Sequence, residues 1–194
     1  SLARYGRYAV APLSAAGMKD DLQIDAGHVG LLVRAGLVHT SPGHLLMNAI
    51  GLVLIGVLGW RLTPLAMRTL SRAATLAALG IVASTVGFLA SYLVRAGPSC
   101  GASAAVYGLF AAAAAEIWAR RKDLPSELRT LVPIIMTALS LGTAFVFIGR
   151  PGMDHAAHLG GWLAGFLGGF ALPYRAGRLT LGGLATALLI AAFL

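Results

Sequence analysis

The chain has 194 residues, of which 58% are hydrophobic and 11% are charged, and its mean hydropathy is +0.80. Soluble domains carry about 25% charged residues, so this composition excludes an ordinary water-soluble protein and favours a membrane protein. The net charge of +8 comes from short basic clusters between apolar runs, a pattern that orients membrane proteins and does not indicate nucleic-acid binding. Cys100 is the single cysteine, which excludes an internal disulfide and a cysteine-based metal cluster.

Residues 1–43 are mixed in character, with acidic and basic residues in the middle, and we predict no spanning helix among them. The apolar stretch 28–38 is interrupted by Arg34 and Gly36. It is either an interfacial segment or an ordinary extramembrane loop. We therefore treat 1–43 as an extramembrane or interfacial region.

Six apolar segments follow, each long enough, or nearly so, for a membrane-spanning helix. The predicted fold is an all-α, polytopic membrane bundle with about six spans. Residues 44–172 form its membrane core, and residues 173–194 form a connector and a last span that is short as it stands. The predicted spans are 44–60, 73–94, 103–119, 130–148, 155–172 and 179–194.

Basic residues predict the orientation of these spans. The connectors after the second and fourth spans each carry one, Arg95 and Arg150. The positive-inside rule places the other, more basic connectors in the cytoplasm. His44, Ser103 and His158 then lie at similar depth near the non-cytoplasmic ends of three helices. The cytoplasmic connectors carry Arg61, Arg68 and Arg72, then Arg120, Arg121, Lys122 and Arg129, and then Arg175 and Arg178.

Polar side chains within a span are costly and usually face the protein interior or a water-filled cavity. His44 and Asn48 are four residues apart and share a helix face, an arrangement that would also suit a simple helix–helix hydrogen bond. His155 lies beside Asp154 at the boundary and is interpreted as a solvated turn residue. His158 lies deeper and is the better catalytic candidate.

A stripe of glycines recurs every four residues along the last core segment, at Gly161, Gly165 and Gly169. Small residues at this spacing let a second helix approach closely, with or without catalysis. The segment that begins at Ser103 offers Ala104, Gly108 and Ala112 at the same spacing. Packing of these two stripes would bring Ser103 within hydrogen-bond reach of His158, as a serine nucleophile requires.

Other intramembrane chemistries lack their residues. There is no His-Glu-x-x-His helix for a zinc protease, and Asp154 is the one aspartate near a span, whereas an aspartyl mechanism needs two. The histidines have no carboxylate or thiolate partners to complete a metal site, so we predict no metal and no cofactor. A serine with a histidine is the chemistry that remains.

Three segments, in this order, resemble the rhomboid intramembrane serine proteases over 39–172. They are 39–48 (HTSPGHLLMN), 101–104 (GASA) and 157–161 (AHLGG). The resemblance implies that Ser103 is the nucleophile and His158 the general base of a dyad without a carboxylate. It also implies an oxyanion hole formed by His44, Asn48 and the Ser103 backbone N–H. Three supporting residues complete the implied site: Tyr107 packed on the imidazole, Gly101 within the serine motif, and Gly161 at the helix contact.

The resemblance further implies a multi-pass protein of a bacterial inner membrane, surrounded by lipid, that cleaves transmembrane protein substrates on the non-cytoplasmic side. Residues 1–40 resemble the loop of the family without the helix that usually precedes it. The sequence does not indicate the oligomeric state.

Three alternatives stay open. Ala104 stands where the family usually has glycine, which leaves room for a proteolytically inactive protein that binds membrane clients. A second alternative is a rhombosortase, which processes substrates with a C-terminal sorting helix. A small transporter or channel is the least favoured, because we detect neither an internal repeat nor a pair of charges that would be buried together.

Overall fold

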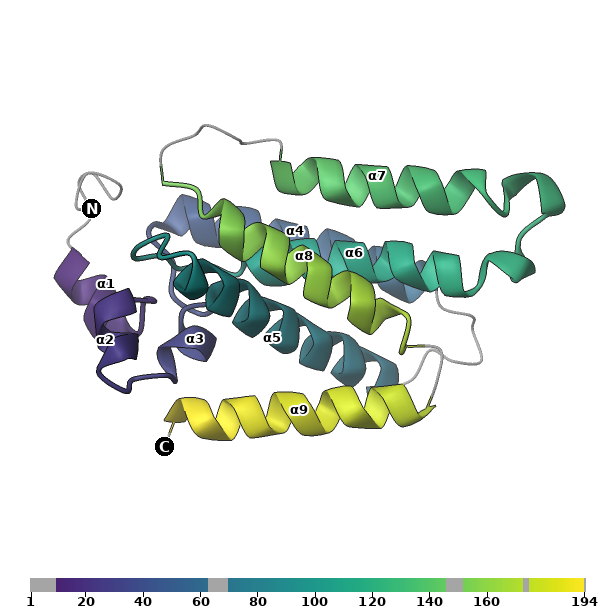
Figure 1. The fold of residues 1–194 in the computed structure, drawn as a ribbon. Coiled ribbons are helices and arrows are strands. Elements are labelled where there is room, and N and C mark those ends of the chain that lie inside the picture. Colours follow the sequence, from purple (N-terminus) through teal and green to yellow (C-terminus); the bar gives the residue numbers. More distant parts are fainter. Residues whose placement is uncertain (1–9, 63–69, 146–151, 173–174, 194) are drawn as a thin grey trace.

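The apolar segments form long helices that lie side by side (Figure 1). The computed structural model describes residues 10–62, 70–145, 152–172 and 175–193, and within these residues there is no β-strand. The all-α helical bundle predicted from the sequence is therefore confirmed. The long helices are α4 (Pro42–Leu62), α5 (Leu70–Leu93), α6 (Ser103–Ala119), α7 (Leu131–Phe145), α8 (His155–Gly169) and α9 (Arg175–Phe193).

Helices α5, α6 and α8 pack against one another in the centre of the bundle. Helix α4 packs on α6, α7 lies along α6 and α8, and α9 lies along α5 on the opposite side (Figure 1). Side-chain hydrogen bonds join α7 to both of its neighbours. The indole of Trp118 donates to Thr137 at 2.8 Å, and the indole of Trp162 donates to Ser140 at 3.1 Å.

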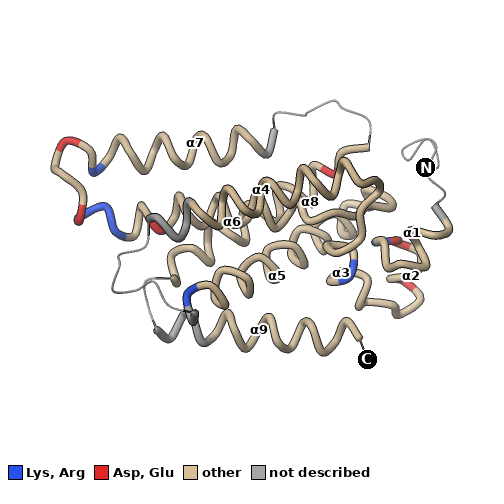
Figure 2. Tube along the Cα trace, turned by 180° about the vertical axis from the view of Figure 1, so that it is seen from behind, with Lys and Arg blue, Asp and Glu red and all other residues tan. Residues whose placement is uncertain are grey.

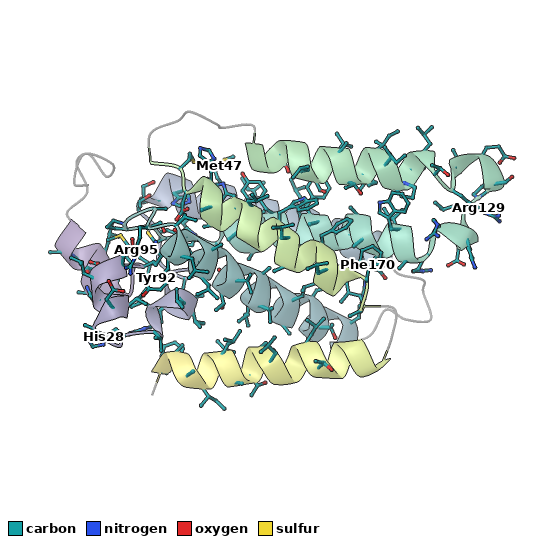
Figure 3. All side chains as sticks on the ribbon, viewed as in Figure 1. His28, Met47, Tyr92, Arg95, Arg129 and Phe170 are labelled. Atoms are coloured by element: carbon teal, nitrogen blue, oxygen red, sulfur yellow. The ribbon has the colours of Figure 1, made fainter. Side chains whose placement is uncertain are left out.

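Three short helices gather at one end of the bundle, where α4, α6 and α8 begin (Figure 1). None approaches the roughly 20 residues that a membrane span needs. The carboxylate of Asp25 fastens this group to the end of α5, since it accepts from Tyr92 at 2.6 Å and from Arg95 at 2.8 Å. Figure 3 shows Tyr92 and Arg95 at this end and Arg129 at the far end. The short helices are α1 (Val10–Ala16), α2 (Asp21–Asp25) and α3 (Leu31–Arg34).

Local sequence explains where the helices begin. Ser41 caps α4 by accepting a hydrogen bond from the His44 backbone N–H at 3.1 Å, and Pro42 occupies the first turn, where its missing donor does no harm. Asp154 caps α8 in the same way, accepting from the Ala157 N–H at 3.0 Å. Both caps hold the starts of helices that carry predicted site residues.

Four basic residues assigned to connectors lie inside helices instead: Arg61 in α4, Arg72 in α5, and Arg175 and Arg178 in α9. Helix α5 begins at Leu70 and includes Arg72, while α9 begins at Arg175 rather than 179. Arg72 can be buried within α5 because its guanidinium is ion-paired with Glu116 of α6 and donates to the Leu172 carbonyl. Both charged residues of this pair are buried. The expectation that the bundle holds no buried ion pair is therefore wrong.

The apolar exterior of the bundle is consistent with a lipid environment. Large hydrophobic side chains on the outward faces of α4, α7 and α9 are exposed, whereas soluble proteins rarely expose extended apolar patches. By length and hydropathy one described helix, Arg72–Leu93, is a candidate span, and half of it is buried. The stretches Pro42–Val57, Ser103–Ala119 and Thr180–Phe193 are apolar but shorter, so the number of spans stays a prediction.

Charged residues separate towards the two ends of the bundle (Figure 2). Arg121, Lys122 and Arg129 lie in the α6–α7 connector, at the end opposite to α1–α3. The predicted site residues belong to the α1–α3 end. This separation agrees with the predicted orientation, which stays a prediction.

Candidate active site

Ser103 and His158 are hydrogen-bonded. Ser103 Oγ lies 2.8 Å from His158 Nε2, although the two residues are 55 positions apart in the chain. Ser103 is the first residue of α6, and His158 lies in the first turn of α8. The serine is partly accessible, whereas the imidazole is 4% exposed. A hydroxyl and an imidazole at this distance can exchange a proton.

The glycine stripe of α8 explains this proximity. A methyl group added at any of the three glycines would overlap the backbone of α6, so the two helices touch without side chains between them. The two stripes of small residues that the sequence suggested as partners do pack against each other. The facing pairs are Gly161 with Ala104, Gly165 with Gly108, and Gly169 with Ala112.

The imidazole of His158 is oriented by packing. The ring of Tyr107, one turn along α6 from Ser103, lies 4.6 Å from it between centroids, and the ring of His155 lies 6.2 Å away, edge to face. Nδ1 of His158 is buried and has no hydrogen-bond partner among the described residues. The carboxylate of Asp154, the nearest acidic residue in the sequence, instead accepts from Ser91 and from the Ala157 N–H.

The loop before Ser103 passes close to α4 at Gly101. This residue has a φ of +127° and is buried, and a methyl group there would overlap the ring of His44 and approach the side-chain amide of Asn48. Glycine is therefore required both by the backbone conformation and by the space available. The contact brings His44 and Asn48 next to the serine motif.

Two donors face this loop from α4. Asn48 is 7% exposed, and its amide nitrogen is buried with no hydrogen-bond partner in the described part of the chain. His44 Nδ1 lies 3.1 Å from the Thr40 hydroxyl. If that hydroxyl donates, Nε2 carries the ring proton and is the free donor. The backbone N–H of Ser103 is also available, since the first N–H groups of a helix have no partner within it.

Ala104, the departure from the family pattern, points away from the dyad. Its methyl group is 1% exposed and packs with Ala35, Phe88 and Ala157. Gly87 of α5 faces the same methyl group and leaves room for it. The additional carbon is thus part of the core between α5 and α8.

Sequence reasoning assigned no role to two residues that support the site. Thr40 contacts His44, and His39 Nε2 accepts from the Ala102 N–H at 3.3 Å. Both lie within the first motif. Their position four or five residues before His44 was the available signal.

Burial raises the pKa of the nearby Cys100 thiol to about 11, so this cysteine is protonated at neutral pH. Among the described residues no group of three or more histidine, cysteine or acidic side chains is arranged to hold a metal.

Comparison with known families identifies the chain. Residues 27–175 match the rhomboid domain. The chain belongs to the rhomboid family. The match begins before the first of the three motifs, so it takes in α3 as well as the membrane core. Rhomboid proteins are integral membrane proteins, and the resemblance read from the sequence is confirmed.

Individual rhomboid relatives agree with this assignment. The chain is 30% identical over 149 residues to RHOMBOID-like protein 4 of Arabidopsis thaliana, covering 74% of this chain and 34% of the relative. It is 32% identical over 145 residues to RHOMBOID-like protein 1 of the same plant, covering 71% and 33%. It is 27% identical over 160 residues to the rhomboid protease GluP of Bacillus subtilis, covering 82% and 29%. This chain thus spans about a third of the length of these relatives, and no solved structure matches it.

Proposed function

We propose that this rhomboid protein is an intramembrane serine protease that uses Ser103 and His158 as a catalytic dyad. The observation that carries the proposal is the 2.8 Å contact between Ser103 Oγ and His158 Nε2 at the partly buried junction of α6 and α8. A neutral hydroxyl is a poor nucleophile until a base takes its proton. The relationship to a protease, GluP, supports the same conclusion.

Catalysis begins when Ser103 Oγ attacks a peptide carbonyl carbon and its proton passes to His158 Nε2. The tetrahedral intermediate then collapses, the C–N bond breaks, and the leaving amine takes the proton from His158. Water attacks the acyl-enzyme with His158 again acting as the base, which releases the carboxylate product and restores Ser103. Tyr107 holds the imidazole in place by ring contact, since His158 Nδ1 has no partner in the described residues.

The oxyanion is stabilised by donors that face the serine motif, namely Asn48 Nδ2, His44 Nε2 and the Ser103 backbone N–H. Asn48 is the strongest of the three assignments. Its buried amide has no partner among the described residues, which destabilises the protein, and the oxyanion would supply the missing acceptor. In soluble serine proteases one such donor contributes about 3–4 kcal/mol to the transition state. When the Thr40 hydroxyl donates to His44 Nδ1, the ring proton of His44 is on Nε2, which is then the donor.

The substrate class is transmembrane helices of other membrane proteins. A peptide bond within a helix is hydrogen-bonded and shielded, so the substrate must unwind locally, and residues that destabilise helices favour cleavage. The site opens to the non-cytoplasmic side, at the end of the bundle opposite to the basic α6–α7 connector. No metal or cofactor takes part in this mechanism.

The proposal is tested by the rate of covalent labelling with a fluorophosphonate, for wild type, Ser103→Ala and His158→Ala in detergent. Labelling of wild type and its loss in both variants supports a protease, whereas equal labelling of all three refutes it.

A non-proteolytic protein that binds membrane clients is the second candidate, suggested by Ala104. The inward packing of the Ala104 methyl group favours the protease. Client co-purification without cleavage, equal in wild type and Ser103→Ala, would favour the second candidate.

Rhombosortase activity is a narrower form of the same proposal. It is distinguished by the substrate, which would be a C-terminal sorting helix rather than an internal transmembrane segment. Cleavage of a model substrate is compared with the reactive helix placed at its C-terminus or followed by a soluble domain. Strict dependence on the C-terminal position would assign the narrower activity.

A further inference from the structure

A lysine is completely buried near the predicted dyad. Lys19 lies between α1 and α2 and is 0% exposed. Its ammonium group is ion-paired with Asp21 at 2.8 Å and donates a hydrogen bond to Ser91 Oγ of α5 at 2.8 Å. Burying an ammonium is costly unless charged and polar partners replace water. Nothing in the proposed chemical steps uses this charge.

The side chain of Lys19 leads to the helix that carries His158. Ser91 accepts from Lys19 and donates to Asp154 Oδ2 at 2.5 Å. The other oxygen of Asp154 caps α8 by accepting the Ala157 N–H at 3.0 Å. A continuous buried chain of hydrogen bonds therefore runs from Lys19 to the first turn of α8, where His158 is located.

The backbone of Lys19 leads to the loop that carries Ser103. Its N–H donates to the Ser99 carbonyl at 3.0 Å, and its carbonyl accepts the Ser99 N–H at 3.1 Å. Asp21 strengthens the same attachment, since its carboxylate accepts the Gly97 N–H at 3.2 Å. Ser99 lies four residues before Ser103. One residue of the amino-terminal region is thus linked both to the start of α8, which carries His158, and to the loop that precedes Ser103.

We propose that Lys19 is a positioning residue for the dyad, because it holds the start of α8 through Ser91 and Asp154 and the Ser103 loop through Ser99. This inference rests on the proposed protease function. It assigns a role to the region before α4: the segment containing Lys19 sets how far His158 lies from Ser103. A shift of about 1 Å between reacting groups can lower a rate by about 100-fold, so a small loosening at Asp154 has a measurable effect.

The proposal is tested with Lys19→Met and Ser91→Ala, each with a matched control. Lys122 is the only other lysine in the sequence and is exposed, so Lys122→Met removes the same charge elsewhere. Ser84 is buried in α5, and its hydroxyl has no hydrogen-bond partner in the described region, so Ser84→Ala controls for Ser91→Ala. Ser91→Ala leaves the Lys19–Asp21 ion pair intact, which keeps the test valid if Lys19→Met does not fold.

The measured quantities are the maximal fluorophosphonate labelling rate and the probe concentration that gives half of it. We expect the maximal rate to fall about tenfold or more in Lys19→Met and Ser91→Ala, since each removes a hydrogen bond to a charged group. The half-saturating concentration should stay within twofold of wild type, because the probe contacts are unchanged. The double variant should lose no more than the larger single loss, since both substitutions break one chain of bonds.

Amide hydrogen exchange gives a second readout that does not depend on activity. We expect faster exchange in the first turn of α8, residues 155–158, in Ser91→Ala but not in Ser84→Ala. Maximal rates and exchange within twofold of the control variants would overturn the positioning role. A uniform rise in exchange over all helices would also overturn it, because the substitution would then weaken the whole fold and not the start of α8 in particular. If wild type does not label, the protease proposal fails, and exchange at residues 155–158 alone still decides whether Lys19 positions α8.

Discussion

Substitution of Gly165 by alanine tests how strictly the α6–α8 contact sets the dyad. The Cβ of an alanine here would lie well inside 3 Å of the carbonyl oxygen, carbonyl carbon and Cα of Gly108. Carbon atoms in ordinary contact are about 3.5–4.0 Å apart, so α8 would have to withdraw from α6 by roughly 1 Å. Gly165 is two turns beyond His158 on the same helix, so the withdrawal separates the imidazole from Ser103.

Two effects are expected in Gly165→Ala. Overpacking should lower the free energy of unfolding by about 1–3 kcal/mol, and the labelling rate should fall by up to about 100-fold through misplacement of His158. Gly183→Ala in α9 is the matched control, because a Cβ there meets nothing within 4 Å. Its better helix propensity should leave stability unchanged or raise it by up to about 1 kcal/mol. The reasoning is refuted if Gly165→Ala labels as fast as Gly183→Ala and unfolds at the same denaturant concentration.

Three further predictions concern single groups. Asn48→Ala should lower the maximal labelling rate about 100-fold with little change in half-saturating probe concentration, because the amide binds the transition state; an unchanged maximal rate would remove Asn48 from the oxyanion hole. Cys100, with its pKa raised from 9.0 to about 11 by burial, should react with a thiol reagent at pH 8 about 100-fold more slowly than an exposed cysteine. Its rate should keep rising with pH towards 11, because the thiolate is the reactive form, and a plateau near pH 9 would contradict the burial argument. Glu116→Gln should lower the free energy of unfolding by about 3–5 kcal/mol, because it removes the carboxylate that is ion-paired with the buried Arg72 guanidinium. Arg72→Met combined with Glu116→Leu should recover part of that loss. Equal stability of Glu116→Gln and wild type in a denaturant titration would contradict this interpretation.

Much of the candidate site could be predicted because its features are local in the sequence. The spacing of Gly161, Gly165 and Gly169 defines a helix face, and the matching stripe on the segment from Ser103 identifies its partner. Basic connectors placed His44 and Ser103 at one end of the bundle. Helical periodicity and the distribution of charge are enough to predict both features.

What could not be predicted depends on contacts between distant residues. Lys19 and Ser91 are 72 positions apart, and a lysine beside two aspartates in a polar stretch resembles an ordinary solvated loop. Arg72 was assigned to a connector, because its buried pair with Glu116 is evident only once α5 lies against α6. The start of α9 was predicted four residues too late. Arg175 and Arg178 are polar, so they were assigned to the connector, although both lie in the first turn of the helix.

The central claim is that Ser103 is a nucleophile activated by His158, and the position of the fluorophosphonate adduct tests it most directly. Intact wild-type protein is labelled, digested and examined by peptide mass spectrometry. The account predicts a single adduct on Ser103 that forms at least about 10³-fold more slowly in His158→Ala. An adduct on another residue, or an adduct on Ser103 that forms equally fast without His158, would contradict the account.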